Sequence, residues 1–291
     1  MTDRHTDRPA LAIAIMIIAV MALVATNVCV KLIGPDTNAV QVVFIRNMVA
    51  SLVLFLFVLR DGRVASFRFR RPGLQLLRAF AGISGIACYY YGVQRISVGE
   101  VTVISQATPL FVAALAVPIL KEAVGWRRWS AILLGFIGVV VALGPVRQAG
   151  FPGLVVVLGA LLWAVTILTV RMLGRTESPA ATTFYYMVIG TLITGVAQPW
   201  VWKTPPSDLW VLFVAAGVLG AMGQLLVAHA LRVGEASIVT PFNYTAIIWG
   251  VAVDFFLWQV FPTVWTLGGA AIITIAGLYL FRREAAVKEA S

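Results

Sequence analysis

Long apolar segments constrain the fold of this sequence more than any other feature. Each is about 20 residues long, which is the length of helix that crosses the ~30 Å hydrocarbon core of a bilayer. We predict ten spans, at residues 10–32, 38–60, 74–95, 98–119, 126–146, 151–173, 178–200, 207–231, 235–258 and 262–281. Of the 291 residues, 60% are hydrophobic and only 12% are charged, which excludes a water-soluble fold. The sequence therefore predicts an all-α integral membrane protein.

Positive charge is distributed unevenly around the predicted spans. When the N-terminus is placed in the cytoplasm, most of the 22 Lys and Arg residues fall in cytoplasmic loops and tails. The exceptions on the other side are Lys31, Arg95, Arg147 and Lys203. This asymmetry follows the positive-inside rule, so we predict a protein of the cell inner membrane with cytoplasmic tails at 1–9 and 282–291. Because the charge is spread over short loops, it predicts no nucleic-acid-binding surface.

The two halves of the chain resemble each other. The phrase Arg95-Ile-Ser-Val-Gly-Glu100 precedes the fourth span, and Ala230-Leu-Arg-Val-Gly-Glu235 precedes the ninth. We therefore predict two five-helix repeats, at 10–146 and 151–281. Since five is an odd number, the second repeat must enter the membrane with the opposite orientation. Inverted repeats allow a transporter to alternate between inward-open and outward-open states around a central site.

Several short motifs carry a resemblance to a known family. They are Arg46-Asn47, Tyr91-Gly-Val-Gln-Arg-Ile-Ser-Val-Gly-Glu100, Thr108-Pro-Leu-Phe111 and Lys121-Glu122. With these motifs the chain resembles the drug/metabolite transporter superfamily, in its EamA-type ten-helix branch, and is most similar to the aromatic amino-acid exporters. It departs from the family at Leu257-Trp258-Gln259, where a small or acidic pair is common.

The resemblance implies a secondary transporter or facilitator that exports a small metabolite, an aromatic or other apolar amino acid, by alternating access. A multidrug or other metabolite exporter of the same fold is the alternative, and an ion channel is a further one. The partners that we predict are the solute and the lipid bilayer, with a monomer as the assumed state.

Polar and aromatic side chains inside the spans are the candidate solute-binding groups, because polar groups in a membrane either pair with other helices or line a wet cavity. The candidates are Asn27, Arg46, Tyr90, Gln106, Trp163, Tyr186, Gln224, Asn243 and Tyr244. Pro109 and Pro241 occupy matching places in the two repeats, and we interpret them either as paired hinges beside the cavity or as packing kinks.

Arg46 is the only basic residue that we place within a span. Its guanidinium is suited to binding a solute carboxylate through two hydrogen bonds, and the alternative is a buried contact with backbone carbonyls or a helix end. Trp163 lies in mid-span, away from the membrane interface where most membrane Trp residues lie. It either forms an aromatic wall for the solute or packs against other helices.

The sequence gives no support for an enzyme or a bound cofactor. It has no glycine-rich nucleotide-binding motif, and its two histidines, His5 and His229, lie in the tail and near a span end, so we expect no metal site. Acidic residues are also scarce within the spans, and only Asp254 is somewhat internal. This scarcity favours facilitated diffusion over proton coupling.

Overall fold

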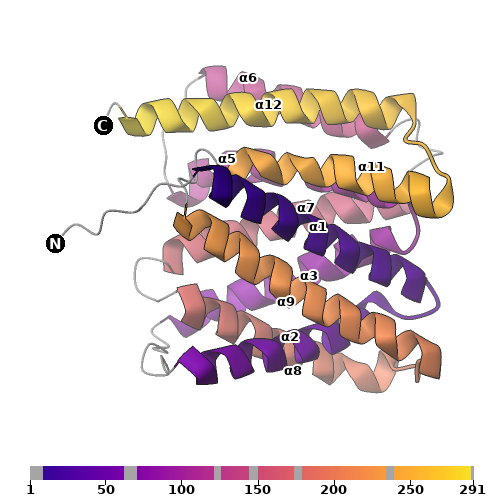
Figure 1. Ribbon diagram of the computed structural model, residues 1–291. Coiled ribbons are helices and arrows are strands. Elements are labelled where there is room, and N and C mark those ends of the chain that lie inside the picture. Colours follow the sequence, from indigo (N-terminus) through magenta and orange to yellow (C-terminus); the bar gives the residue numbers. More distant parts are fainter. Residues whose placement is uncertain are drawn as a thin grey trace.

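The protein is a bundle of helices that lie side by side with their axes roughly aligned (Figure 1). A computed structural model describes residues 9–61, 71–120, 126–143, 150–173, 179–233 and 239–289. The helices of the first half are α1 (Pro9–Ile33), α2 (Ala39–Asp61), α3 (Pro72–Val93), α4 (Val98–Ser105), α5 (Thr108–Leu120) and α6 (Trp126–Leu143). Those of the second half are α7 (Gly150–Leu173), α8 (Pro179–Val201), η2 (Ser207–Leu209), α9 (Trp210–Val233), η3 (Thr240–Tyr244), α11 (Thr245–Trp258) and α12 (Val264–Glu289).

These elements form ten helical tracts in the described residues, in the places where the apolar segments predict ten spans. Four of them are long and apolar enough by length and composition to cross a membrane, and four shorter ones are apolar over 10–17 residues. The start of α1 and the end of α12 lie at the same end of the bundle (Figure 1). Helix α12 continues to Glu289, so its charged end extends past the predicted boundary at 281. The predicted tail at 1–8 lies outside the described residues.

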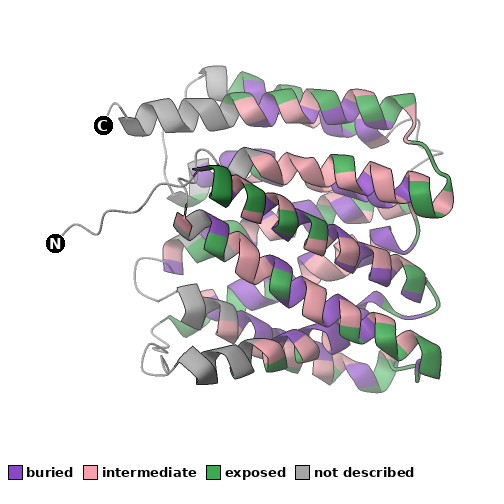
Figure 2. Cartoon of the chain, viewed as in Figure 1, coloured by how far each residue is buried: buried purple, intermediate pink, exposed green. Residues whose placement is uncertain are grey.

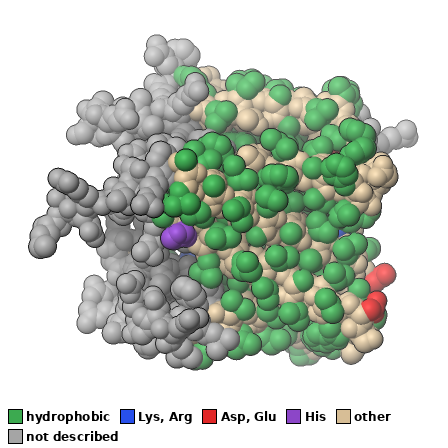
Figure 3. Space-filling view, in the orientation of Figure 1, with side chains coloured by type: hydrophobic (Ala, Val, Ile, Leu, Met, Phe, Trp, Pro, Cys, Tyr) green, Lys and Arg blue, Asp and Glu red, His purple; other side chains and the backbone are tan. Residues whose placement is uncertain are grey.

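The outer surface of the bundle is apolar. Side chains such as Leu52, Val140, Val196 and Ile275 are more than half exposed, and exposed positions occur along the lengths of the helices (Figure 2). The face seen in Figure 3 is covered with hydrophobic side chains, and its acidic groups and histidine lie toward its edges. Such a surface is stable in lipid and not in water. The fold is that of an all-α integral membrane protein.

The packing of the helices shows how the two halves are combined. The main contacts are α1 with α9, α3 with α7, α2 with α8 and α6 with α12. We take α1, α2, α3 and α6 of the first half to correspond to α7, α8, α9 and α12 of the second. Exchanging the halves then turns the α1–α9 contact into the α7–α3 contact. The α2–α8 and α6–α12 contacts are each turned into themselves. The two repeats are therefore arranged with approximate two-fold symmetry.

Glycines allow close contacts between these helices. Gly85 of α3 and Gly159 of α7 face each other, and a β-carbon on either would lie 3.0–3.2 Å from the other's carbonyl oxygen. The absence of side chains at such positions lets membrane helices approach closely. This contact brings α3 and α7 together beside the centre of the bundle.

The fourth tract is interrupted at Gln106 and Ala107, just before Pro109. Helix α4 begins with a capping box, in which the side chain of Ser97 accepts from the N–H of Glu100 and the Glu100 carboxylate accepts from the N–H of Ser97. Pro109 is the second residue of α5, a position at which its missing N–H needs no helical partner. The carbonyl of Ser105 instead accepts from the hydroxyl of Thr108 at 2.8 Å. The proline thus follows the break without distorting a continuous helix.

The ninth tract has a related interruption. Here the five-residue 3-10 helix η3 precedes α11, and Pro241 is the second residue of η3. Each repeat therefore contains one discontinuous tract, and each discontinuity contains a proline. Non-helical backbone at this depth is tolerated where protein or a wet cavity satisfies its polar groups.

Candidate solute-binding cavity

A cavity of about 360 Å³ lies between the two repeats. Its polar and aromatic lining residues are Thr26, Asn27, Arg46, Tyr89, Tyr90, Thr102, Ser105, Gln106, Thr108, Trp163, Gln224 and Asn243. They come from α1 to α5 of the first repeat and from α7, α9 and η3 of the second. The cavity lies where the two broken tracts approach each other, so both repeats supply its walls.

The two interruptions are in direct contact. The side-chain amide of Gln106 donates to the backbone carbonyl of Asn243 at 3.2 Å. Gln106 is the residue that ends α4, and Asn243 lies within η3. This bond uses a carbonyl of the irregular segment and ties the first repeat to the second at the cavity wall.

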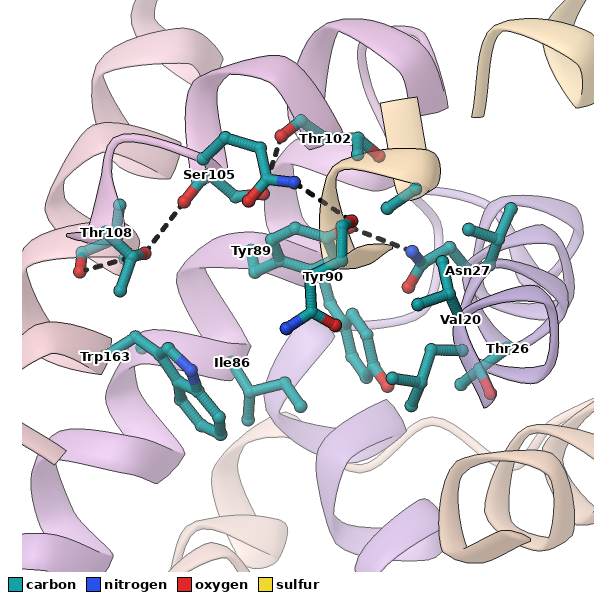
Figure 4. Close-up of a pocket in the computed structure, with 18 of the residues that line it drawn as sticks. Val20, Thr26, Asn27, Ile86, Tyr89, Tyr90, Thr102, Ser105, Thr108 and Trp163 are labelled. Atoms are coloured by element: carbon teal, nitrogen blue, oxygen red, sulfur yellow. Dashed lines mark hydrogen bonds between the residues drawn. The ribbon is translucent and has the colours of Figure 1, made fainter. Parts of the chain in front are cut away.

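A second bond crosses the cavity wall from α1 to α3. The amide nitrogen of Asn27 donates to the hydroxyl oxygen of Tyr89 at 2.8 Å (Figure 4). Tyr89 was not among the residues predicted for the site, although its neighbour Tyr90 was. The signal for it was the run Tyr89-Tyr90-Tyr91, of which the first two line the cavity.

Arg46 places a positive charge on the cavity wall. Its side chain is only 3% exposed, its Nη1 donates to Oδ1 of Asn47 at 3.2 Å, and its guanidinium lies 5.9 Å from the centre of the Tyr90 ring. Its Nε has no hydrogen-bond partner, and no carboxylate among the described residues lies within salt-bridge distance. A buried guanidinium with spare donors and no counter-charge is suited to an anionic ligand.

Aromatic and aliphatic groups form another part of the lining. Trp163 of α7 and Ile86 of α3 flank the open space, with the Tyr89 and Tyr90 rings nearby (Figure 4). Trp163 lies one turn beyond Gly159, which also lines the cavity. The cavity therefore combines one cation, several amides and hydroxyls, and flat ring surfaces.

The structure brings most of the predicted residues together. Asn27, Arg46, Tyr90, Gln106, Trp163, Gln224 and Asn243 line the cavity, as does Pro109. Tyr186, Tyr244 and Pro241 are not among its lining residues. Tyr244 points toward Gly277 of α12, where its hydroxyl occupies the place of a β-carbon. Tyr186 is buried against Gly82 of α3.

The prediction that Arg46 is the only basic residue within a span is wrong. Arg78, which lies near the start of the third predicted span at 74–95, is buried within α3 at 8% exposure. Its guanidinium lies 5.0 Å from the centre of the Tyr186 ring. The aromatic face provides a favourable surface for this charge, so both Arg78 and Tyr186 are accounted for by a contact away from the cavity.

In the described part of the chain, no three His, Cys, Asp or Glu side chains come together in an arrangement that could hold a metal ion. The cavity lining contains no carboxylate. The arrangement is suited to reversible binding of an organic solute through charge, amide and ring contacts.

Comparison with known proteins identifies the same pattern in each half of the chain. Residues 10–144 and 151–283 each match the EamA-like transporter family. The S-adenosylmethionine uptake transporter of Rickettsia conorii is 30% identical over 265 residues, covering 89% of this chain and 88% of the relative. The pseudopaline exporter CntI of Pseudomonas aeruginosa strain PAO1 is 25% identical over 278 residues, covering 94% and 96%.

Two further comparisons extend the similarity. The riboflavin transporter of Brucella anthropi is 26% identical over 279 residues, which is 92% of this chain and 98% of that protein. A solved crystal structure with 16% sequence identity superposes with a TM-score of 0.64 and covers 94% of this chain and 98% of its own. At that identity the crystal structure supports the fold alone.

Proposed function

We propose, from the premise that the chain belongs to the EamA-like transporter family, that it carries a small metabolite with a carboxylate and an aromatic or apolar body. An amino acid or a compound derived from one has this chemistry. The transporter would work by alternating access in the inner membrane, with both chain ends in the cytoplasm. Membership of the family makes it a transporter of small molecules and not an enzyme; the solute is the proposal.

The observation that carries the proposal is the state of Arg46. Its guanidinium lies on the cavity wall, is almost fully buried, and has neither a carboxylate partner among the described residues nor a hydrogen bond at Nε. Placing a charge in such a position is costly unless it is compensated. A solute carboxylate would supply the missing charge and accept the spare N–H groups.

The remaining lining residues are suited to the part of the solute other than its carboxylate. The rings of Trp163, Tyr89 and Tyr90 offer flat apolar surfaces to an aromatic or aliphatic body, and the amides of Asn27 and Gln224 offer hydrogen bonds to its polar groups. Among the relatives, one is named for S-adenosylmethionine, a compound with both an amino-acid carboxylate and an aromatic base. That chemistry is compatible with the lining described here.

The relatives are named for uptake as well as for export, so the family leaves the direction open. In a facilitator the direction of net flux follows the concentration gradient of the solute. We propose net export driven by the outward gradient of a metabolite made in the cell. This proposal is tested by measuring counterflow in vesicles that hold solute first on one side and then on the other. Transport that stays one-way when the solute gradient is reversed would contradict a gradient-driven direction.

The solute proposal is tested with purified protein in proteoliposomes and a panel of labelled solutes. The panel compares phenylalanine with phenylalaninamide, which differs only in lacking the carboxylate, and includes S-adenosylmethionine and riboflavin. The wild-type protein is expected to prefer the acid over the amide in saturable, competed flux. Equal flux of acid and amide, or flux that does not saturate, would contradict the proposal.

Arg46→Gln provides the matched variant. It should abolish the preference for the acid and weaken its binding by about 10- to 100-fold, the effect of losing a charge-assisted hydrogen bond. Arg95→Gln, which changes an exposed arginine that contacts Tyr91 and lies outside the cavity lining, is the control and should keep the preference. Thermal unfolding in detergent separates loss of binding from loss of fold.

A further inference from the structure

Asp254 and Lys31 form an ion pair between the two repeats. The Nζ atom of Lys31, on α1, lies 3.7 Å from Oδ1 of Asp254, on α11. Lys31 lies one turn beyond Asn27, which lines the cavity, and Asp254 lies two turns beyond Ala246, which also lines it. The pair is therefore located between the cavity and the end of the bundle at which α1 ends.

The Asp254 carboxylate also caps the start of α4. Its Oδ1 accepts from the N–H of Val98 at 3.0 Å and its Oδ2 accepts from the N–H of Gly99 at 2.5 Å. These are the first residues of α4, whose N–H groups have no partner within the helix and lie at the positive end of its dipole. Asp254 is 3% exposed. A carboxylate of the second repeat thus replaces water at a helix end of the first.

Gly99 makes this approach possible. A β-carbon at Gly99 would lie 3.1 Å from Oδ2 of Asp254 and 3.5 Å from Cα of Val251. Gly250 of α11, one turn before Asp254, similarly faces Gly99 and the Thr102 hydroxyl. The backbones of α4 and α11 therefore approach each other closely at this end of the cavity.

Lys31 adds two further contacts to the same cluster. Its Nζ donates to the carbonyl of Ile96, in the connection between α3 and α4, at 2.9 Å. It also lies 4.9 Å from the centre of the ring of Trp258, at the end of α11. Lys31 thus links α1 to the connection before α4 and to the end of α11. Separation of α1, α4 and α11 would remove all these bonds together, and this is costly because the Asp254 carboxylate is buried.

We propose that Asp254 and Lys31 form a latch that closes the cavity at the end where α1 ends, and that the latch opens to admit solute from that side. The opening step rests on the proposed transport function, whereas the closed latch does not. Separation of α1, α4 and α11, the three elements that the cluster joins, would open a path from this side to the cavity. Water entering with the opening of the path would solvate both charges.

The latch is tested by the access of a reagent to the cavity. In a background with Cys29→Ala and Cys88→Ala, Ser105→Cys places one thiol on the cavity wall. A membrane-impermeant maleimide is added from the side at which α1 ends. Labelling of a separate variant, Asp208→Cys, identifies that side, because Asp208 is an exposed residue near the start of α9.

Asp254→Asn should raise the rate of labelling at Ser105→Cys about tenfold, because the amide cannot pair with Lys31 and can accept through only one of its two atoms. Lys31→Gln should act in the same direction while leaving the α4 cap intact, which makes it the second variant if Asp254→Asn folds poorly. Asp208→Asn is the control for removal of a carboxylate and should leave the rate unchanged. Unchanged labelling in folded Asp254→Asn and Lys31→Gln would overturn the latch.

A disulfide provides the converse test. Gly99→Cys with Val251→Cys joins α4 to α11, because a β-carbon at Gly99 lies 3.5 Å from Cα of Val251, within the reach of a disulfide. Oxidation should lower the flux of the double variant relative to the same protein under reducing conditions; Gly99→Cys alone should not respond to oxidation. Undiminished flux in the fully oxidised double variant would contradict an opening at this end.

The two proposals fail in different ways. The labelling experiment uses no solute, so it tests the latch even if the panel contains no carried compound. If wild-type protein transports solute but labelling is insensitive to the latch variants, the latch is wrong and the transport proposal stands. If labelling responds but the acid and amide are carried equally, the solute assignment is wrong and the latch stands.

Discussion

Gly220 of α9 lies against the guanidinium of Arg46 on α2. A β-carbon on Gly220 would come 2.8 Å from Nη2 and 2.9 Å from Nε of the arginine, closer than side chains pack. We expect Gly220→Ala to displace the guanidinium and to destabilise the protein by about 1–3 kcal/mol, the usual cost of overpacking. Carboxylate solutes should bind more weakly as well, which equilibrium binding and thermal unfolding would show.

The control for Gly220→Ala is Gly268→Ala in α12, where a β-carbon would meet only Val141 at 3.7 Å. That substitution should leave binding unchanged and should be neutral or slightly stabilising, since alanine is favoured over glycine within a helix. Equal effects of the two substitutions on solute binding would show that Gly220 does not position Arg46.

Trp163 is expected to contribute to the binding of aromatic solutes. Trp163→Ala removes a ring from the cavity wall and should raise the KM for an aromatic solute by about 3- to 10-fold, corresponding to a stacking contact of ~1 kcal/mol. An aliphatic solute should be affected less. Trp200→Ala is the matched control, because that ring is 80% exposed at the end of α8. Comparable KM changes in both variants would exclude a specific role for Trp163.

The bond between Asn27 and Tyr89 predicts a measurable coupling. Asn27→Ala and Tyr89→Phe each remove one partner of the 2.8 Å bond, and each should destabilise the protein by about 1 kcal/mol. The double variant should lose less than the sum, with a coupling of about 0.5–1.5 kcal/mol in a double-mutant cycle based on unfolding. Strict additivity would show that the bond makes no net contribution.

Pro109 predicts an effect on rate. Pro109→Ala restores an N–H that can donate to the carbonyl of Ser105, which now accepts from the Thr108 hydroxyl, and so favours one continuous helix in place of α4 and α5. If the break acts as a hinge, transport should slow several-fold with little change in KM. Pro199→Ala, at an exposed proline inside α8, should leave the rate unchanged. Normal rates in Pro109→Ala would favour a packing kink.

Local sequence patterns were sufficient to predict the helices. The apolar run at 10–32 corresponds to α1 at Pro9–Ile33, and Pro109, which we interpreted as a hinge or a packing kink, lies just after the break between α4 and α5. Both features depend on neighbouring residues, because the length of an apolar run and the position of a proline determine where a membrane helix can continue.

Long-range contacts were not accessible from the same patterns. Lys31 was assigned to the outer loops and Asp254 was noted only as somewhat internal, yet they are paired across the two repeats. Arg78 has the sequence context of a loop edge and is nevertheless buried over Tyr186. Whether a polar residue faces the cavity, a neighbouring ring or a helix end depends on the assembled helices, which one local pattern does not encode.

The exchange of partners between the repeats has a consequence for biogenesis. Helices α1 and α3 pack against α9 and α7, which the ribosome makes only after the first repeat is complete. The first repeat must therefore wait in the bilayer with these faces covered by lipid or by another protein until the second repeat is inserted. Because each half needs the other's surfaces, two separately expressed halves should accumulate together and be degraded alone.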